Sequence, residues 1–201
     1  MTIASLKHLR RLLRQDRGIA ITEFGLIAPV FFLLLLGLYD ITHTAYARSV
    51  FAGAVERAAR AAALETGDPD AADQMIEDLV SPVLPGVEIE TERQSYFDFA
   101  DIGRPEKFTD SNDNDVCDNN ESFTDLNGNG VRDEDIGLSG NGGASDVVMY
   151  TVTATYTPLF KVPFLPEAWN TRTLTATAVK KNQPFGNQTT FTPTPLTCSD
   201  S

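Results

Sequence analysis

An unbroken apolar segment near the N-terminus limits the folds open to this chain more than any other feature. Between Gly18 and Tyr39 the only clearly polar side chains are Thr22 and Glu23. As a helix, these residues span roughly 33 Å, enough to cross a bilayer core. A secretory signal peptide is the alternative, but its apolar region is shorter and ends at small residues, whereas these leucines run into Tyr39-Asp40. The segment predicts a transmembrane helix over residues 19–39.

Charge is distributed unevenly about this segment. Residues 1–18 carry five Lys or Arg and one Asp, a net charge of +4, so the chain's total of −12 leaves −16 for the rest. The positive-inside rule predicts a cytoplasmic basic leader over residues 1–18 and an outer domain over residues 40–181. In a bacterium this means a single-pass inner-membrane protein with its C-terminal domain in the periplasm. Because so acidic a body repels phosphate backbones, we expect cations as charged partners and no nucleic acid.

One carboxylate, Glu23, lies inside the apolar segment, where it costs about 3 kcal/mol or more unless it has a partner. One interpretation is that its side chain reaches back to the cytoplasmic interface. The other is that the chain is cut after Gly18, which makes Ile19 the new amino terminus, about one helical turn from Glu23. When such helices pack with a stagger, the carboxylate of one chain neutralises the amine of the next, and each charge offsets the other's desolvation.

The residues around this position resemble the processing motif of type IV prepilins. The stretch reads Arg17-Gly18-Ile19-Ala20-Ile21-Thr22-Glu23-Phe24. It is most similar to pseudopilins of the tight-adherence (Tad/Flp) pilus system, where an aromatic residue, commonly Tyr, follows the glutamate; Phe24 lacks only the hydroxyl. With the Ala- and Arg-rich sequence that follows, residues 17–66 resemble a TadE-like domain.

This resemblance implies a processing site and a set of partners. A prepilin peptidase would cleave between Gly18 and Ile19, and Glu23 and Phe24 would act in assembly. The N-terminal helix would lie in the lipid bilayer and pack with other pilins or pseudopilins at an inner-membrane assembly platform. The processed chain would then remain there or reach the pilus or cell surface.

Beyond the membrane segment, the pattern predicts more helix and then strands. Helical spacing continues to about Glu65, and Gly67-Asp68-Pro69 ends it before a second helix over residues 69–80. One face of the first helix carries small and apolar side chains: Ala47, Phe51, Ala54, Val55, Ala58 and Ala62. This face is expected to pack on the outer domain.

Alternating apolar and polar residues predict three strands, over residues 87–92, 148–157 and 173–178. Residues 158–166 form a proline-broken connection, and the Thr-, Pro- and Asn-rich residues 182–201 predict a poorly ordered, flexible tail. The expected fold class is α+β: a pilin-like long N-terminal helix that continues into an outer domain with a small antiparallel sheet.

An internal repeat lies within residues 108–136. The eleven residues from Phe108 to Asp118 recur 15 residues later, with seven identical positions. Oxygen-bearing side chains occupy positions 1, 3, 5 and 9 when Asp110 or Asp125 is position 1, and the apolar residue at position 7 can offer its carbonyl. This spacing converges oxygen ligands on Ca²⁺. The candidate ligands are Asp110, Asn112, Asn114, Val116, Asp118 and Glu121 in the first copy, and Asp125, Asn127, Asn129, Val131, Asp133 and either Glu134 or Asp135 in the second.

The two copies differ at the positions that shape and close such a loop. In the first, Glu121 occupies position 12, but Asp115 replaces the usual glycine at position 6, where the backbone is left-handed. In the second, Gly130 fits position 6, but position 12 is Ile136, so Glu134 or Asp135 must substitute or a ligand is missing. The copies resemble EF-hand-like and dockerin-like calcium loops; the alternative is a solvated acidic loop.

The cysteines and histidines predict no catalytic or paired-cysteine metal site. Cys117 lies inside the first loop, where a disulfide with Cys198 would hold the tail. His8 and His43 have no metal-ligand spacing, and we expect no enzyme activity. The leading hypothesis is a TadE-like pseudopilin or minor pilin with a calcium-stabilised outer lobe. The alternative is an unprocessed, signal-anchored protein with a calcium-dependent adhesive or binding domain.

Overall fold

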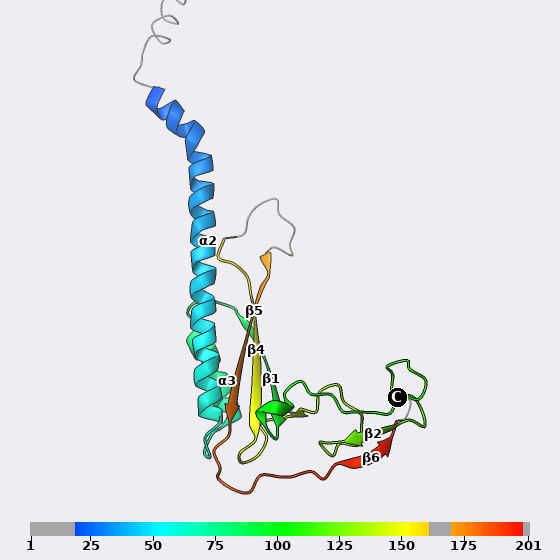
Figure 1. Ribbon diagram of the computed structural model, residues 1–201. Helices are drawn as coiled ribbons and strands as arrows, with labels where there is room; N and C mark the ends of the chain where they lie inside the picture. The colour runs from blue at the N-terminus through cyan, green and yellow to red at the C-terminus, as the bar shows by residue number, and fades with distance from the viewer. Residues whose placement is uncertain (1–18, 161–169, 199–201) are drawn as a thin grey trace, which may run out of the picture. The chain divides into compact units, whose positions relative to one another are not determined.

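The computed structural model describes residues 19–160 and 170–198. The predicted leader, including Gly18, lies outside these residues, as do most of the proline-broken connection and residues 199–201. The described chain has the predicted α+β arrangement, a long helix followed by a small antiparallel sheet (Figure 1). In chain order the elements are α2 (Ile19–Ala62), α3 (Pro69–Val80), β1 (Glu88–Tyr96), η2 (Phe99–Asp101), β2 (Ser122–Asp125), β3 (Leu138–Ser139), β4 (Val147–Tyr156), β5 (Arg172–Lys181) and β6 (Thr194–Thr197).

The N-terminal part of α2 is long and apolar enough to cross a membrane by length and composition. Its large apolar side chains from Ile21 to Leu38 are between 45% and 83% exposed. The helix continues through Pro29, which removes one backbone hydrogen bond without ending it. An exposed apolar helix of this length supports a single-pass membrane anchor.

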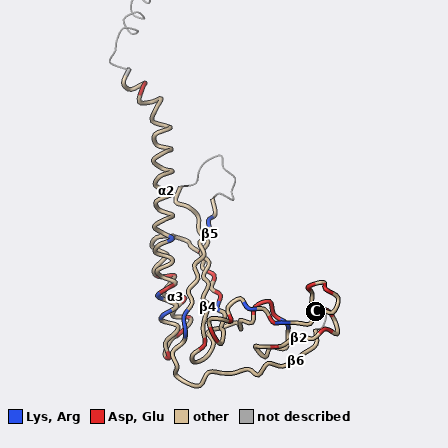
Figure 2. The backbone as a smooth tube through the Cα atoms, viewed as in Figure 1, with Lys and Arg blue, Asp and Glu red and all other residues tan. Residues whose placement is uncertain are grey.

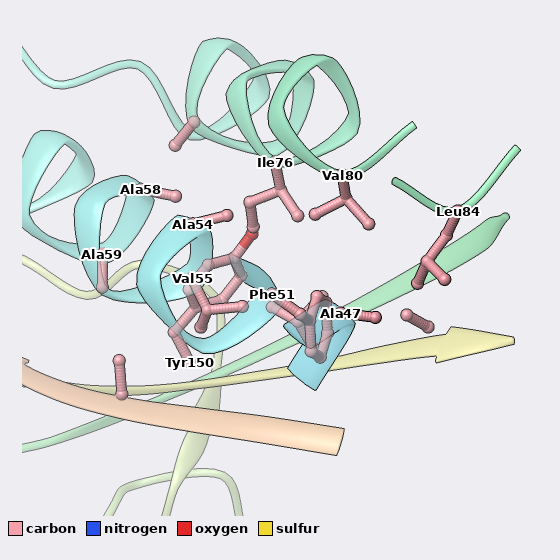
Figure 3. Close-up of a cluster of buried hydrophobic side chains, with 14 of the residues drawn as sticks. Ala47, Phe51, Ala54, Val55, Ala58, Ala59, Ile76, Val80, Leu84 and Tyr150 are labelled. Carbon is pink, nitrogen blue, oxygen red and sulfur yellow. The ribbon is translucent and has the colours of Figure 1, made fainter. Parts of the chain in front are cut away.

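The outer unit, residues 46–201, has its own core. The predicted apolar face of α2 is buried, from Ala47 to Ala62, with every member at most 7% exposed. Figure 3 shows this face packed with α3, which contributes Ile76 and Val80, and with Tyr150 of the sheet. The small alanines allow the helix to approach the sheet closely, and the large side chain of Phe51 fills the centre of the cluster.

The main sheet has the order β3-β1-β4-β5, and every pairing is antiparallel. The register runs from Glu88–Thr155 to Tyr96–Val147 between β1 and β4, and β5 pairs with β4 along its whole length. The three predicted strands are therefore confirmed. The strand β1 continues four residues beyond the predicted end, to Tyr96. The prediction stopped at residue 92 because the later residues do not alternate between apolar and polar: Arg93, Gln94, Ser95 and Tyr96 are all buried or half-buried.

A second sheet was not predicted. It consists of β2 and β6, paired from Ser122–Thr197 to Asp125–Thr194. The prediction of a poorly ordered tail over residues 182–201 is therefore wrong for β6. Composition identified the Thr- and Pro-rich sequence as irregular, but its backbone pairs with a segment some 70 residues earlier, a long-range contact that local composition does not encode.

A polar network fixes α3 to the sheet. The guanidinium of Arg93 donates to both carboxylate oxygens of Asp73 and lies 4.3 Å from the centre of the Tyr150 ring, while the Tyr150 hydroxyl also donates to Asp73. Burial by itself would raise the pKa of the Asp73 carboxyl, but the donors Arg93 and Tyr150 outweigh it and hold this pKa below its usual value. The network therefore favours the charged carboxylate.

Asp73→Asn is expected to destabilise the outer unit by about 1–3 kcal/mol at neutral pH, because it leaves the largely buried Arg93 without its counter-charge. The stability due to a depressed carboxyl pKa is present above the unfolded value and is lost as pH falls through the folded one. The difference from wild type should therefore shrink below pH 3.8. Urea unfolding of the full chain in detergent at pH 7 and pH 3 measures this. The exposed Asp78→Asn, also in α3, is the control, and an equal loss in both variants would contradict the prediction.

Candidate functional site

Two regions hold the predicted site residues: the start of α2 and the acidic repeat. The described helix begins at Ile19, and Glu23 follows one turn later, on the same side of the helix. Glu23 is exposed, as is Phe24 at 61%. Within the described residues, no Lys or Arg forms an ion pair with Glu23. The structure thus presents one carboxylate, Glu23, on the surface of the apolar part of α2, residues 19–39.

In the acidic lobe, residues 104–136, the two copies of the repeat face each other. The amide of Thr109 donates to Ser122 O at 2.8 Å, and the amide of Thr124 donates to Lys107 O at 3.0 Å. Between these bonds, Phe108 and Phe123 form an isolated antiparallel bridge. Thr124 is the equivalent of Thr109 in the second copy, and Ser122 is the equivalent of Lys107. The two hydrogen bonds are therefore related by exchange of the copies, which pair with approximate twofold symmetry. Figure 2 shows Asp and Glu concentrated in this lobe.

The first copy folds as a tight loop around Asp110. The carboxylate of Asp110 accepts hydrogen bonds from the backbone N–H groups of Asn112, Asn114 and Asp115, at 3.2, 3.3 and 2.8 Å. These bonds, led by that from Asp115, hold the pKa of Asp110 below its usual value. Asp115 has a φ of 58°, so position 6 has the expected left-handed backbone, as does Gly130 in the second copy at 80°.

Side chains at positions 3, 5 and 9 meet in both loops. In the first, one oxygen of Asp118 accepts from the side-chain amides of Asn112 and Asn114, each at 2.8 Å. In the second, one oxygen of Asp133 accepts from Asn127 and Asn129, at 2.8 and 2.7 Å. The repeated pattern brings equivalent oxygen-bearing side chains together in each copy.

A glutamate bridges positions 2 and 9 of each loop. In the first loop, Glu121 accepts from the backbone N–H groups of Ser111 at 2.7 Å and Asp118 at 3.1 Å. In the second loop, the equivalent N–H groups of Leu126 and Asp133 donate to Glu106, at 2.6 and 3.2 Å. Glu106 lies 15 residues before Glu121, and each glutamate stands two residues before the phenylalanine that begins a copy. When the repeat is extended to begin at these glutamates, each unit supplies the glutamate that closes the other unit's loop.

The two residues expected to close the second loop have other contacts. Glu134 is 79% exposed and pairs with Arg132, while Asp135 accepts from the Tyr96 hydroxyl at 2.8 Å and from Gly137 N at 3.1 Å. The sequence pattern predicted a closing carboxylate after the second copy, at Glu134 or Asp135, whereas the closing glutamate, Glu106, lies before the first copy. The signal was present: Glu106-Lys107-Phe108-Thr109-Asp110 and Glu121-Ser122-Phe123-Thr124-Asp125 share four of five residues.

Three carboxylates of the lobe are buried without cationic partners among the described residues. Glu106, Glu121 and Asp125 are 1%, 5% and 5% exposed, and no described Lys or Arg lies within 4 Å of their oxygens. Burying a carboxylate is costly unless it is paired and hydrogen-bonded. The residues described contain no group of three or more Asp, Glu, His or Cys placed to hold a metal ion. A cation bound here would therefore need the asparagine oxygens and a backbone carbonyl as ligands in addition to carboxylates.

The C-terminal segment is joined to the first loop. Cys117 and Cys198 form a disulfide, and the amide of Cys198 donates to Glu121 O at 2.8 Å. Cys117 directly precedes Asp118, the position-9 residue. The cross-link thus reaches the same loop that Glu121 closes.

Comparisons with known proteins bear on the N-terminal region only. Neither the curated proteins nor the solved structures gave a match to the chain. One family does match, over residues 18–60, which excludes the acidic repeat and the sheet. Its description is TadE-like protein, so residues 18–60 of this chain are similar to TadE-like proteins.

Proposed function

We propose that this chain is a TadE-like pseudopilin or minor pilin, cleaved after Gly18 by a prepilin peptidase, that takes part in the assembly of a Tad/Flp-type pilus. The observation that carries the proposal is the TadE-like match over the helix whose exposed apolar surface holds one carboxylate a turn beyond Ile19. The basic residues before Gly18 support a cytoplasmic N-terminus in the bacterial inner membrane, with the outer unit in the periplasm.

In this proposal, charge pairing selects correctly processed partners. Cleavage gives Ile19 a positive amine in or near the hydrocarbon, and Glu23 of a neighbouring pilin neutralises it when the two helices pack with a stagger. An unprocessed chain has no amine at this place, so its helix lacks the matching charge. The same surface would dock at the inner-membrane assembly platform and, after assembly, lie within the pilus.

The acidic lobe would hold calcium. The side-chain oxygens at positions 1, 3, 5 and 9 and the carbonyls of Val116 and Val131 are the proposed ligands, with Glu121 closing the first loop and Glu106 the second. Ca²⁺ prefers six to eight oxygen ligands of this kind, and millimolar calcium outside the cell suits even a weak site. The ion would offset the negative charge of carboxylates that are buried without a Lys or Arg partner in the described structure.

The amino terminus of the membrane-extracted protein tests the proposal. Co-expressed with a prepilin peptidase, the chain should begin at Ile19 by intact-mass spectrometry, with or without an N-methyl group; without the peptidase it should begin at Met1. Gly18→Val should block the cut, because a branched side chain replaces the glycine next to the cleaved bond, while Gly25→Val, inside the helix, is the control. A chain that keeps Met1 under all conditions would instead support an unprocessed, signal-anchored adhesive protein.

A further inference from the structure

The C-terminal strap, residues 182–198, crosses from the end of β5 to the acidic lobe. Near its start, the amide of Gln183 donates to Ala63 O at 3.0 Å. Farther along, the Gln188 side chain donates to Phe97 O and to the Asp146 carboxylate, each at 2.8 Å. The strap then forms β6 and ends at Cys198. It therefore contacts the helix end, the main sheet and the lobe in turn.

Few buried apolar side chains hold the far half of the strap. Phe191 is 46% exposed, and of the four residues of β6 only Leu196 is half-buried. A two-stranded ribbon such as β2–β6 is marginally stable by itself. Cys198 differs from its neighbours, because it is 7% exposed and covalently bound to Cys117. The disulfide is thus the strongest attachment of this half.

The strap also forms one wall of the cleft between the sheet and the lobe. This cavity of about 460 Å³ is lined by Thr189, Thr190 and Phe191 of the strap, and also by Tyr96 and Ile136. Phe191 lies so close to the second loop that a Cβ on Gly128 would stand 2.8 Å from its ring. Because the strap supplies part of this lining, its release would expose the buried side chains of Tyr96 and Ile136.

We propose that the Cys117–Cys198 disulfide is a latch that holds the strap across this cleft, so that oxidation of the two thiols is the step that completes the outer unit. In that step the sulfur–sulfur bond forms as each thiol gives up one proton and one electron. A disulfide of an oxidising protein or small molecule accepts them, and its own bond breaks to two thiols. Because thiols stay reduced in the cytoplasm, the latch closes only after the outer unit has left that compartment. The proposal does not depend on calcium.

Hydrogen exchange of the full chain in detergent tests the latch. With a phosphine reductant, or in Cys198→Ser, backbone amides of residues 188–198 and of β2 should exchange on the order of a hundredfold faster, since the cross-link no longer restricts local opening. Amides of β4 should keep their protection, and an apolar fluorescent dye should bind more strongly. The double variant Cys117→Ser/Cys198→Ser, with and without reductant, controls for the reagent and should show no further change.

Two results would overturn the proposal. One is unchanged exchange in the strap after reduction and in Cys198→Ser, which would show that β6 and Phe191 suffice to hold it. The other is an equal loss of protection in β4, which would make the disulfide a general support of the outer unit. Neither result bears on cleavage after Gly18 or on calcium binding, which are measured separately.

Discussion

Glu106→Gln is expected to weaken calcium binding by the second loop and to leave the first loop unchanged. Glu106 is 1% exposed, and both of its oxygens accept backbone hydrogen bonds at the place that Glu121 occupies in the first loop. The amide keeps the shape and one acceptor oxygen but loses the negative charge. Mutation of a residue that only supports a metal ligand through a hydrogen bond typically lowers metal affinity about 10- to 100-fold. We expect Glu106→Gln to lower the calcium affinity of the second loop by at least this much.

Calorimetric titration of the chelator-treated full chain in detergent measures this affinity. Wild type should bind two ions and Glu106→Gln one at the wild-type affinity. Glu121→Gln should mirror it by weakening the first loop. The control is Glu134→Gln, which removes a charge that is 79% exposed and should change little. An equal loss of calcium affinity in Glu134→Gln and Glu106→Gln would show that the effect comes from overall charge and not from loop closure. If wild type binds no calcium, the lobe is a solvated acidic loop and the calcium proposal is wrong.

Thermal unfolding provides an independent measure of the same site. A ligand that binds only the folded state stabilises it by about 2.7 kcal/mol for each site at a concentration one hundred times its Kd. Wild type should therefore melt higher with calcium than with a chelator, and Glu106→Gln should lose about half of that increase. Magnesium at equal concentration is the ionic-strength control, because it demands a more rigid, smaller cage.

Local sequence signals predicted the helices and long strands well, because each depends on residues close together in the chain. Asp68 caps α3 by accepting from the amides of Asp70 and Ala71, and Pro69 occupies the first turn, so the predicted start of that helix is the observed one. The alanine face of α2 and the alternation in β4 likewise follow from period alone. Such patterns predict which face is buried but not what covers it.

Features that depend on distant residues were missed. The strand β6 exists because it pairs with β2, and the late part of β1 is partly buried because Arg93 meets Asp73 of α3. Glu106 is the most informative case. The spacing of a single calcium loop predicts that each loop is closed by a residue at about its own position 12, which is Glu121 in the first loop but Ile136 in the second. In the twofold pair, the second loop is closed by Glu106, which lies 19 residues before Asp125 in the chain, so no spacing within the second loop reveals it.

Glu23→Gln is expected to leave cleavage after Gly18 intact and to abolish pairing between processed chains. The amide removes a charge that costs about 3 kcal/mol in the hydrocarbon, so membrane insertion should be as good as or better than in wild type. The amine of the neighbouring Ile19 then has no counter-charge. A loss of about 3 kcal/mol corresponds to more than a hundredfold in association. A merely interfacial glutamate would give no such loss.

Two differently tagged copies in the same membrane, co-expressed with a prepilin peptidase and cross-linked before extraction, measure this pairing. Wild-type copies should co-purify, and Glu23→Gln copies should not, although both begin at Ile19 by mass spectrometry. Thr22→Val, which alters the adjacent residue without changing charge, is the matched control, and Glu23→Asp should retain part of the pairing because it keeps the charge on a shorter side chain. If Glu23→Gln copies associate and assemble as wild type does, then the carboxylate selects no partner, and the function of the helix must lie in its apolar surface alone.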